Sequence, residues 1–218
     1  MLRQFGTDEF LFILMAARWT VLLSLIAFAG GSIGGLAIAL ARVSPQTILA
    51  GSARGFIQVF QGTPLLMQLF LVFFGANALG LDINPWIAAA IALTLNASAF
   101  LGEIWRGCIQ AVPKGQWEAA SALGLHYPAM MRYVILPQAF KIALPPTVGF
   151  LVQLIKATSL AAIIGFTEVT RAGQIINNAT FRPFLVFGIV AAIYFVLCWP
   201  LSHLSMRLER RFAAATRR

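Results

Sequence analysis

The chain has 218 residues, of which 60% are hydrophobic and 11% are charged, and its mean hydropathy is +0.84. Since a soluble domain has about 45–50% apolar and about 25% charged residues, this composition excludes an ordinary globular domain. The net charge of +9 does not indicate a nucleic-acid-binding protein, because the basic residues lie mainly between and after apolar runs, as they do in membrane proteins.

Continuous apolar runs predict an all-α, polytopic membrane protein. Lipid offers the backbone no hydrogen-bond partner, and about 20 helical residues are needed to cross the hydrocarbon core. The chain is therefore predicted to form one transmembrane domain, residues 1–218, with five spanning helices. In chain order they are expected over residues 19–41, 56–79, 86–106, 138–164 and 184–204.

Glycine and proline mark special points in these helices. The first predicted helix follows Arg18 and contains a run of small residues, 30–35, which predicts the close approach of another helix. Thr63-Pro64 interrupts the second helix early, and the Pro145-Pro146 pair is expected to kink the fourth. The stretches 107–132 and 167–182 are too polar to span.

The basic residues predict the orientation. Five spans place the termini on opposite sides, and most of the 16 Lys and Arg residues fall on the side of the C-terminus. The positive-inside rule then predicts an extracytoplasmic N-terminus and a cytoplasmic C-terminus. The two cysteines and two histidines form no metal or redox motif, so no metal site is expected.

The cytoplasmic segment 107–136 is too patterned for a plain linker. Trp117, Ala120, Leu123, Gly124 and Tyr127 recur at helical spacing and are predicted to share one face. The alanines give the short helix a slim surface, and Gly124 is expected to end it. Such a helix, projecting from a membrane domain, suits insertion into a groove on a partner.

This segment resembles the EAA loop of ABC-importer permeases. The matching residues are Glu118, Ala119, Ala120 and Gly124, followed by Val134-x-Leu136-Pro137, where isoleucine is more usual than Val134. Other stretches resemble the polar-amino-acid branch of that family, and the resemblance covers about residues 20–208. These stretches are 61–68 (QGTPLLMQ), 102–107 (GEIWRG), 113–116 (PKGQ) and 156–160 (KATSL), with Glu168 beyond them.

The resemblance implies a type I ABC-importer permease fold in a bacterial inner membrane, with a cytoplasmic coupling helix. Its implied partners are a second permease chain, identical or related, two ATP-binding subunits, a periplasmic solute-binding protein and an amino-acid substrate. The residues implied to couple to the ATPase are Glu118, Ala119, Ala120, Gly124 and Leu125. The chain has no G-x-x-x-x-G-K-[ST] loop, so we expect it to be no enzyme and to bind no cofactor, with ATP and Mg²⁺ on the partner ATPase.

Polar side chains within the predicted spans are candidates for a substrate pathway, because such groups at membrane depth usually face a cavity or a partner. The candidates are Gln68, Asn96, Glu103, Gln153, Lys156, Thr158, Ser159 and Glu168.

Local roles are the alternatives for several of these side chains. Glu103 is placed to pair with Arg106 on the same helix, and Lys156 to tie two helices together. Thr158 and Ser159 are placed to bond to their own helix. Glu168, three residues before Arg171, fits either an outer gate or a local pair.

Two other functions compete with the importer hypothesis. A secondary transporter or channel would use intramembrane Glu and Lys as a proton relay, but five helices are few for that purpose. A scaffold without a transport role would not need polar residues in the membrane. The sequence leaves open which amino acid is carried and whether the permease pairs with itself.

Overall fold

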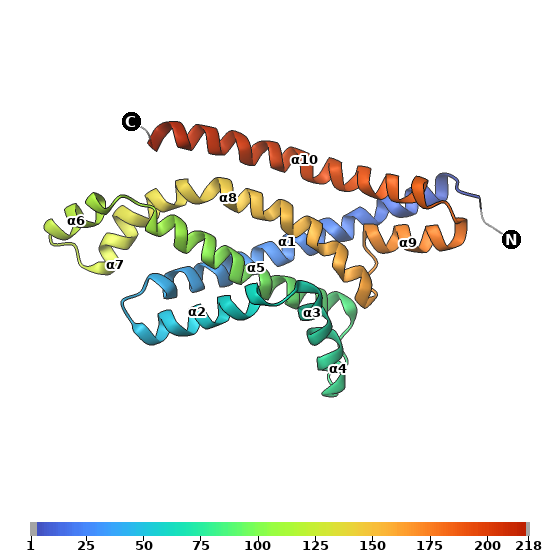
Figure 1. The fold of residues 1–218 in the computed structure, drawn as a ribbon, viewed down its shortest axis with the longest axis horizontal. Helices are drawn as coiled ribbons and strands as arrows, with labels where there is room; N and C mark the ends of the chain where they lie inside the picture. Colours follow the sequence, from blue (N-terminus) through green and yellow to red (C-terminus); the bar gives the residue numbers. More distant parts are fainter. Residues whose placement is uncertain (1–3, 217–218) are drawn as a thin grey trace.

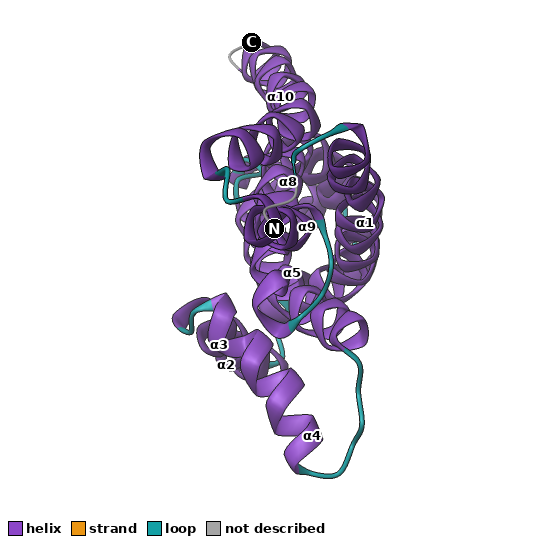
Figure 2. Ribbon diagram, turned by 90° about the vertical axis from the view of Figure 1, so that its right-hand side faces the viewer, coloured by secondary structure: helices purple, strands orange, loops and turns teal. Residues whose placement is uncertain are grey.

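The computed structural model describes residues 4–216, and helices are the regular structure formed in that range (Figures 1 and 2). The four long helices are α1 (Thr7–Val43), α5 (Pro85–Gln110), α8 (Leu136–Ala157) and α10 (Pro183–Thr216), and they run along the long axis of the molecule. The shorter α-helices are α2 (Thr47–Gly62), α3 (Leu65–Phe70), α4 (Ala76–Ala78), α6 (Lys114–Ala122), α7 (Tyr127–Met130) and α9 (Val169–Thr180). Two π-helical segments, η1 (Leu71–Gly75) and η2 (Met131–Ile135), and one 3₁₀-helix, η3 (Thr158–Ile164), complete the described elements.

The helices confirm the predicted membrane fold. Four helical runs in the described range are long and apolar enough to cross a membrane, namely Thr7–Val43, Pro85–Gln110, Tyr127–Ile164 and Pro183–Phe212. A bent pair, Thr47–Gly62 with Leu65–Ala78, makes a fifth span if it counts as one. The start of α1 and the end of α10 lie at opposite ends of the molecule (Figure 1).

The second span is broken at the predicted place. Its two halves meet at an angle of 102° around Thr63-Pro64. Pro64 has no N–H to donate and forces the preceding residue out of the helical region, and Thr63 accordingly has an extended backbone (φ −113°, ψ 141°). As a result α3 and α4 leave the bundle to one side (Figure 2).

Two predicted boundaries are wrong. The first helix begins at Thr7 rather than near residue 19, so Arg18 lies inside it, with its guanidinium over the Trp19 ring. The last helix, α10, continues to Thr216 rather than ending near residue 204. The polar stretch 167–182, which was predicted not to span, contains the short amphipathic helix α9, whose apolar side packs on α1 and α10. At both of these helix ends the apolar run was a poor guide, because a helix can continue beyond the membrane.

Small residues bring α1 and α5 into close contact, as predicted. A Cβ added at Gly31 would lie 2.4 Å from the Ala97 side chain, and one added at Gly102 would lie 2.6 Å from Ile38. The main core surrounds this contact, with Leu23 of α1, Leu93 of α5 and Leu154 of α8 all buried. These three helices form the frame that positions the polar residues.

Candidate functional site

A cavity of about 230 Å³ lies beside the break between α2 and α3. The broken span supplies one wall and α5 and α8 supply the others. Where the walls from α5 and α8 meet, the rings of Phe100 and Phe150 stack on each other, with centroids 5.8 Å apart. The lining residues are Phe60, Thr63, Leu65, Asn96, Phe100, Phe150, Gln153, Leu154 and Ala157.

Gln68 fixes the shape of the break. Its buried side-chain amide donates hydrogen bonds to the carbonyl oxygens of Phe60 (2.8 Å) and Thr63 (3.1 Å), which the interrupted helix leaves without partners. Its carbonyl oxygen accepts a bond from the Asn96 amide of α5 (3.0 Å). Gln68 therefore holds Asn96 at the cavity wall but does not itself line the cavity.

The polar residues at the end of α8 and the start of η3 have different surroundings. Gln153 lines the cavity, whereas Lys156 does not, although both are exposed. Lys156 follows Ile155, which packs against Cys198 of α10. The hydroxyls of Thr158 and Ser159 donate to the carbonyls of Ile155 and Lys156, each at 2.7 Å, so both bond to their own helix. This is the local role considered from the sequence.

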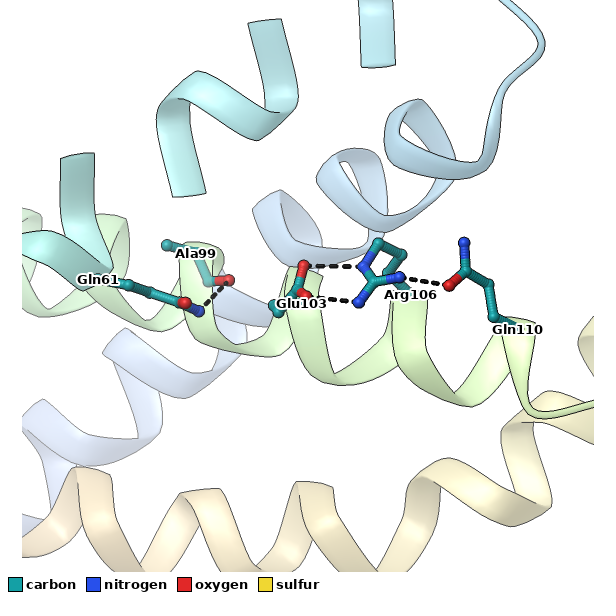
Figure 3. A network of polar contacts seen from close by, with 5 residues as sticks. All are labelled: Gln61, Ala99, Glu103, Arg106 and Gln110. Carbon is teal, nitrogen blue, oxygen red and sulfur yellow. Dashed lines mark hydrogen bonds and ion pairs between the residues drawn. The ribbon is translucent and has the colours of Figure 1, made fainter. Parts of the chain in front are cut away.

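Glu103 forms an ion pair with Arg106 on the same helix (Figure 3). Arg106 Nε donates to Glu103 Oε2 at 2.9 Å, its terminal nitrogen contacts the other carboxylate oxygen, and the same guanidinium contacts Gln110. Gln61 reaches across from α2 to the carbonyl oxygen of Ala99 (3.4 Å). The pairing with Arg106 is confirmed, and Glu103 lies outside the cavity lining.

Glu168 is fully buried at the start of α9 and connects three helices. Its carboxylate accepts bonds from the Arg171 backbone N–H (2.9 Å), the Tyr194 hydroxyl of α10 (2.7 Å) and, more weakly, the Thr20 hydroxyl of α1 (3.5 Å). Burial raises the pKa of the Glu168 carboxyl above its usual range, and this effect exceeds the lowering of the pKa by the hydrogen bonds from Tyr194 and the Arg171 backbone. The Arg171 guanidinium contacts Gln174 instead, so Glu168 caps α9 rather than pairing with Arg171 through side chains.

The segment around α6 lies at the same end of the molecule as the α1–α2 connection and the end of α10 (Figure 1). Ala120 is buried, and Trp117 and Tyr127 pack against Met131 and Ile135. The Tyr127 hydroxyl donates to the carbonyl oxygen of Val43 at the end of α1 (2.7 Å).

The prediction that Leu123 shares this inward face is wrong, because 81% of Leu123 is exposed. Residues three apart on a helix drift by about 60°, so Leu123 lies about 120° from Trp117 around the axis. Glu118 and Ala119 are exposed as well, and Leu125 is half-buried. Gly124 has a left-handed backbone (φ +71°), which ends the helix and favours glycine there.

Comparison with known proteins gives the family. The sequence profile of the family described as "Binding-protein-dependent transport system inner membrane component" matches residues 31–218. This chain belongs to that family. The permease is 38% identical over 206 residues to the probable amino-acid ABC transporter permease YckA of Bacillus subtilis, covering 94% of this chain and 91% of that protein. It is also 38% identical over 197 residues to the glutamine permease GlnP of Escherichia coli K12, covering 89% and 90%.

Solved structures agree with this assignment. The permease superposes on a chain of an amino acid ABC transporter crystallised with histidines, with a TM-score of 0.87 and 39% identity over 92% of this chain and 94% of that chain. A chain of the inward-facing MetNI methionine transporter has the same fold, with a TM-score of 0.80 and 18% identity over 95% and 99%. The permease is thus a multi-pass inner-membrane component of an ABC transporter, whose ATPase is a separate subunit.

Sequence reasoning missed two partners of Glu168 in this permease. Thr20 and Tyr194 lie in apolar spans, 148 and 26 residues from Glu168 in the sequence. The available signal was the presence of a hydroxyl in an apolar helix, which calls for a hydrogen-bond partner when buried. Helical spacing alone does not say which helices are neighbours.

Proposed function

We propose that this permease imports amino acids as one of two permease chains, identical or related, above two ATP-binding subunits. The proposed coupling to the ATP-binding subunits is supported by one observation, which is that α6 exposes one side while its other side packs on a buried cluster. The amino-acid class is supported by the relatives, since those most similar include permeases named for amino acids. A periplasmic binding protein would deliver the solute, and ATP and Mg²⁺ would act on the partner ATPase.

The build of α6 supports a docking element. Trp117 and Ala120 face the membrane domain, and the Tyr127 bond to Val43 fixes the segment to the end of α1. Glu118, Ala119 and Leu123 are left facing outward. A leucine that is 81% exposed, outside the spanning helices, gains free energy when a partner covers it. A push on this surface would be transmitted to α1 and α8 together.

The cavity supports the pathway part of the proposal. Asn96 and Gln153 line the cavity at the broken span, and Gln68 holds Asn96 there. The other candidates have partners elsewhere, since Glu103, Thr158 and Ser159 bond within their own helical runs and Glu168 bonds to α1 and α10. Lys156 is exposed on a spanning helix, where lipid cannot solvate its charge. We therefore place it toward the second permease chain. In this arrangement the N-terminus is periplasmic and α6 is cytoplasmic with the C-terminus.

Co-purification with the ATP-binding chain tests the coupling surface. Glu118→Lys and Gly124→Asp should each lose the ATP-binding chain during affinity purification, because one reverses a charge on the docking side and the other strains a left-handed turn. Asp82→Lys is a matched control, since Asp82 is exposed in the connection before α5, far from α6 along the chain. Retention of the ATP-binding chain by both loop variants, or transport by the permease without it, would refute the proposal.

A further inference from the structure

We infer that the cavity selects amino acids whose side chain carries no net charge. The inference rests on the proposed function, since it takes the cavity as the place where the permease meets its solute. It narrows the substrate class to uncharged polar side chains, such as that of glutamine, and places cationic and anionic amino acids among the poor substrates.

The chemistry of the wall is the first observation. Among the described residues that line the cavity, none is ionisable, and the polar ones are Thr63, Asn96 and Gln153. The Thr63 hydroxyl already donates to the Val59 carbonyl (2.7 Å). The Asn96 amide donates one hydrogen to Gln68, which leaves its second N–H and its carbonyl oxygen for a solute, and Gln153 adds a second amide. Amides both donate and accept hydrogen bonds without carrying charge.

The closest ionisable residues along α5 and α8 lie outside the cavity lining. Glu103 lies two helical turns beyond Asn96, roughly 10 Å along α5, and Arg106 neutralises it. Lys156 lies one turn beyond Gln153 and does not line the cavity, and the residue before it, Ile155, packs against Cys198 of α10. Neither charged side chain belongs to the lining, so the wall itself holds no counter-charge for a charged solute.

Electrostatics then decides the selectivity. The ammonium and carboxylate groups are common to all amino acids, so the cost of their burial cancels when two substrates are compared. A guanidinium or a second carboxylate in a wall rich in phenylalanine would lose its hydration without gaining a counter-charge. An amide side chain would instead exchange its water for Asn96 and Gln153, and its methylene groups would pack on Phe100 and Phe150.

Direct binding to the purified permease–ATPase complex in lipid nanodiscs, without the binding protein, tests the inference. The probes are radiolabelled L-glutamine, L-arginine and L-glutamate. The wild-type complex should bind L-glutamine at least tenfold more tightly than either charged amino acid. Gln153→Glu should raise the affinity for L-arginine relative to L-glutamine at least tenfold, and Gln153→Lys should do the same for L-glutamate. Gln58→Glu, the same change at an exposed position of α2 outside the lining, should leave the wild-type ratios unchanged.

Each outcome is decisive. Equal or tighter binding of a charged amino acid by the wild type, or ratios that Gln153→Glu leaves unchanged, would overturn the inference. So would the absence of binding of all three probes to a complex that still drives uptake. ATP-driven uptake of amino acids by the full complex, measured in parallel, keeps the two proposals distinct. If that uptake persists, only the cavity assignment has failed, and if no amino acid is taken up, the proposed function has failed.

Discussion

One added methyl group at Gly31 tests the packing on which the frame depends. The new Cβ would lie 2.4 Å from Ala97 Cβ and 3.2 Å from the Ala97 carbonyl carbon. Carbon atoms in contact prefer a separation of about 3.5–4.0 Å, so α1 and α5 must move apart by roughly 1 Å. The obstacle is a methyl group fixed to the backbone, which has no rotamer to escape into. Overpacking of this kind costs about 1–3 kcal/mol.

Thermal unfolding of the purified permease in detergent measures this cost. At about 2–4 °C per kcal/mol for a chain of this size, Gly31→Ala should lower the unfolding temperature by roughly 5 °C. Gly107→Ala is the matched control on α5, because nothing lies within 4 Å of its added Cβ and alanine is the better helix former. If Gly31→Ala unfolds at the temperature of the control, the helices are not in contact along this stripe, and the reasoning fails.

Three further predictions concern polar contacts of Glu168 and Tyr127. Glu168→Ala removes the acceptor shared by the Tyr194 hydroxyl and the buried Thr20 hydroxyl. It should lower the unfolding temperature more than Glu168→Gln, since an orphaned buried donor costs about 1–3 kcal/mol. Burial raises the pKa of Glu168 above its ordinary 4.5, so the folded protein binds this proton more tightly than the unfolded chain. The stability of the wild type should therefore fall as the pH rises from about 4.5 through the raised pKa. Unfolding temperatures of Glu168→Gln, measured over the same pH range, should lack that fall. Tyr127→Phe removes the bond to Val43 and should leave the ATP-binding chain attached while reducing uptake per ATP hydrolysed. An unchanged ratio would show that this bond has no part in coupling.

The parts of the fold that could be predicted from sequence are those fixed by local chemistry. Long apolar runs indicate spanning helices because lipid offers the backbone no hydrogen-bond partner. The break at Thr63-Pro64 was foreseeable because Pro64 has no N–H to donate and disfavours a helical backbone at Thr63. The small residues 30–35 indicate a close helix contact, which the approach of Gly31 to Ala97 confirms. None of these inferences requires knowing which helices are neighbours.

The parts that could not be predicted depend on that missing knowledge. Gln68 and Asn96 were each candidates, but their hydrogen bond joins residues 28 apart, and the spacing within one helix cannot reveal it. The pairing of Glu103 with Arg106 was foreseeable because it lies within one helix. The choice among local alternatives for Thr158 was not, since only the geometry shows that its hydroxyl bonds to Ile155.

The proposed coupling requires that motion at α6 reach the cavity, and the helical run Tyr127–Ile164 offers a direct route. Tyr127 packs in the α6 segment and Gln153 lines the cavity, about 39 Å away at 1.5 Å per residue. A stiff run over that distance carries a displacement without a relay of side chains. Between η2 and the cavity, its weak point is the Pro145-Pro146 pair, because two prolines without N–H groups leave two intrahelical hydrogen bonds missing. There the neighbouring helices brace it, because Ser205 of α10 donates to the Pro145 carbonyl (2.8 Å) and Trp105 of α5 donates to the Thr147 hydroxyl (2.8 Å). The bracing bonds lie where the run would otherwise bend, which is the placement that transmission to the cavity requires.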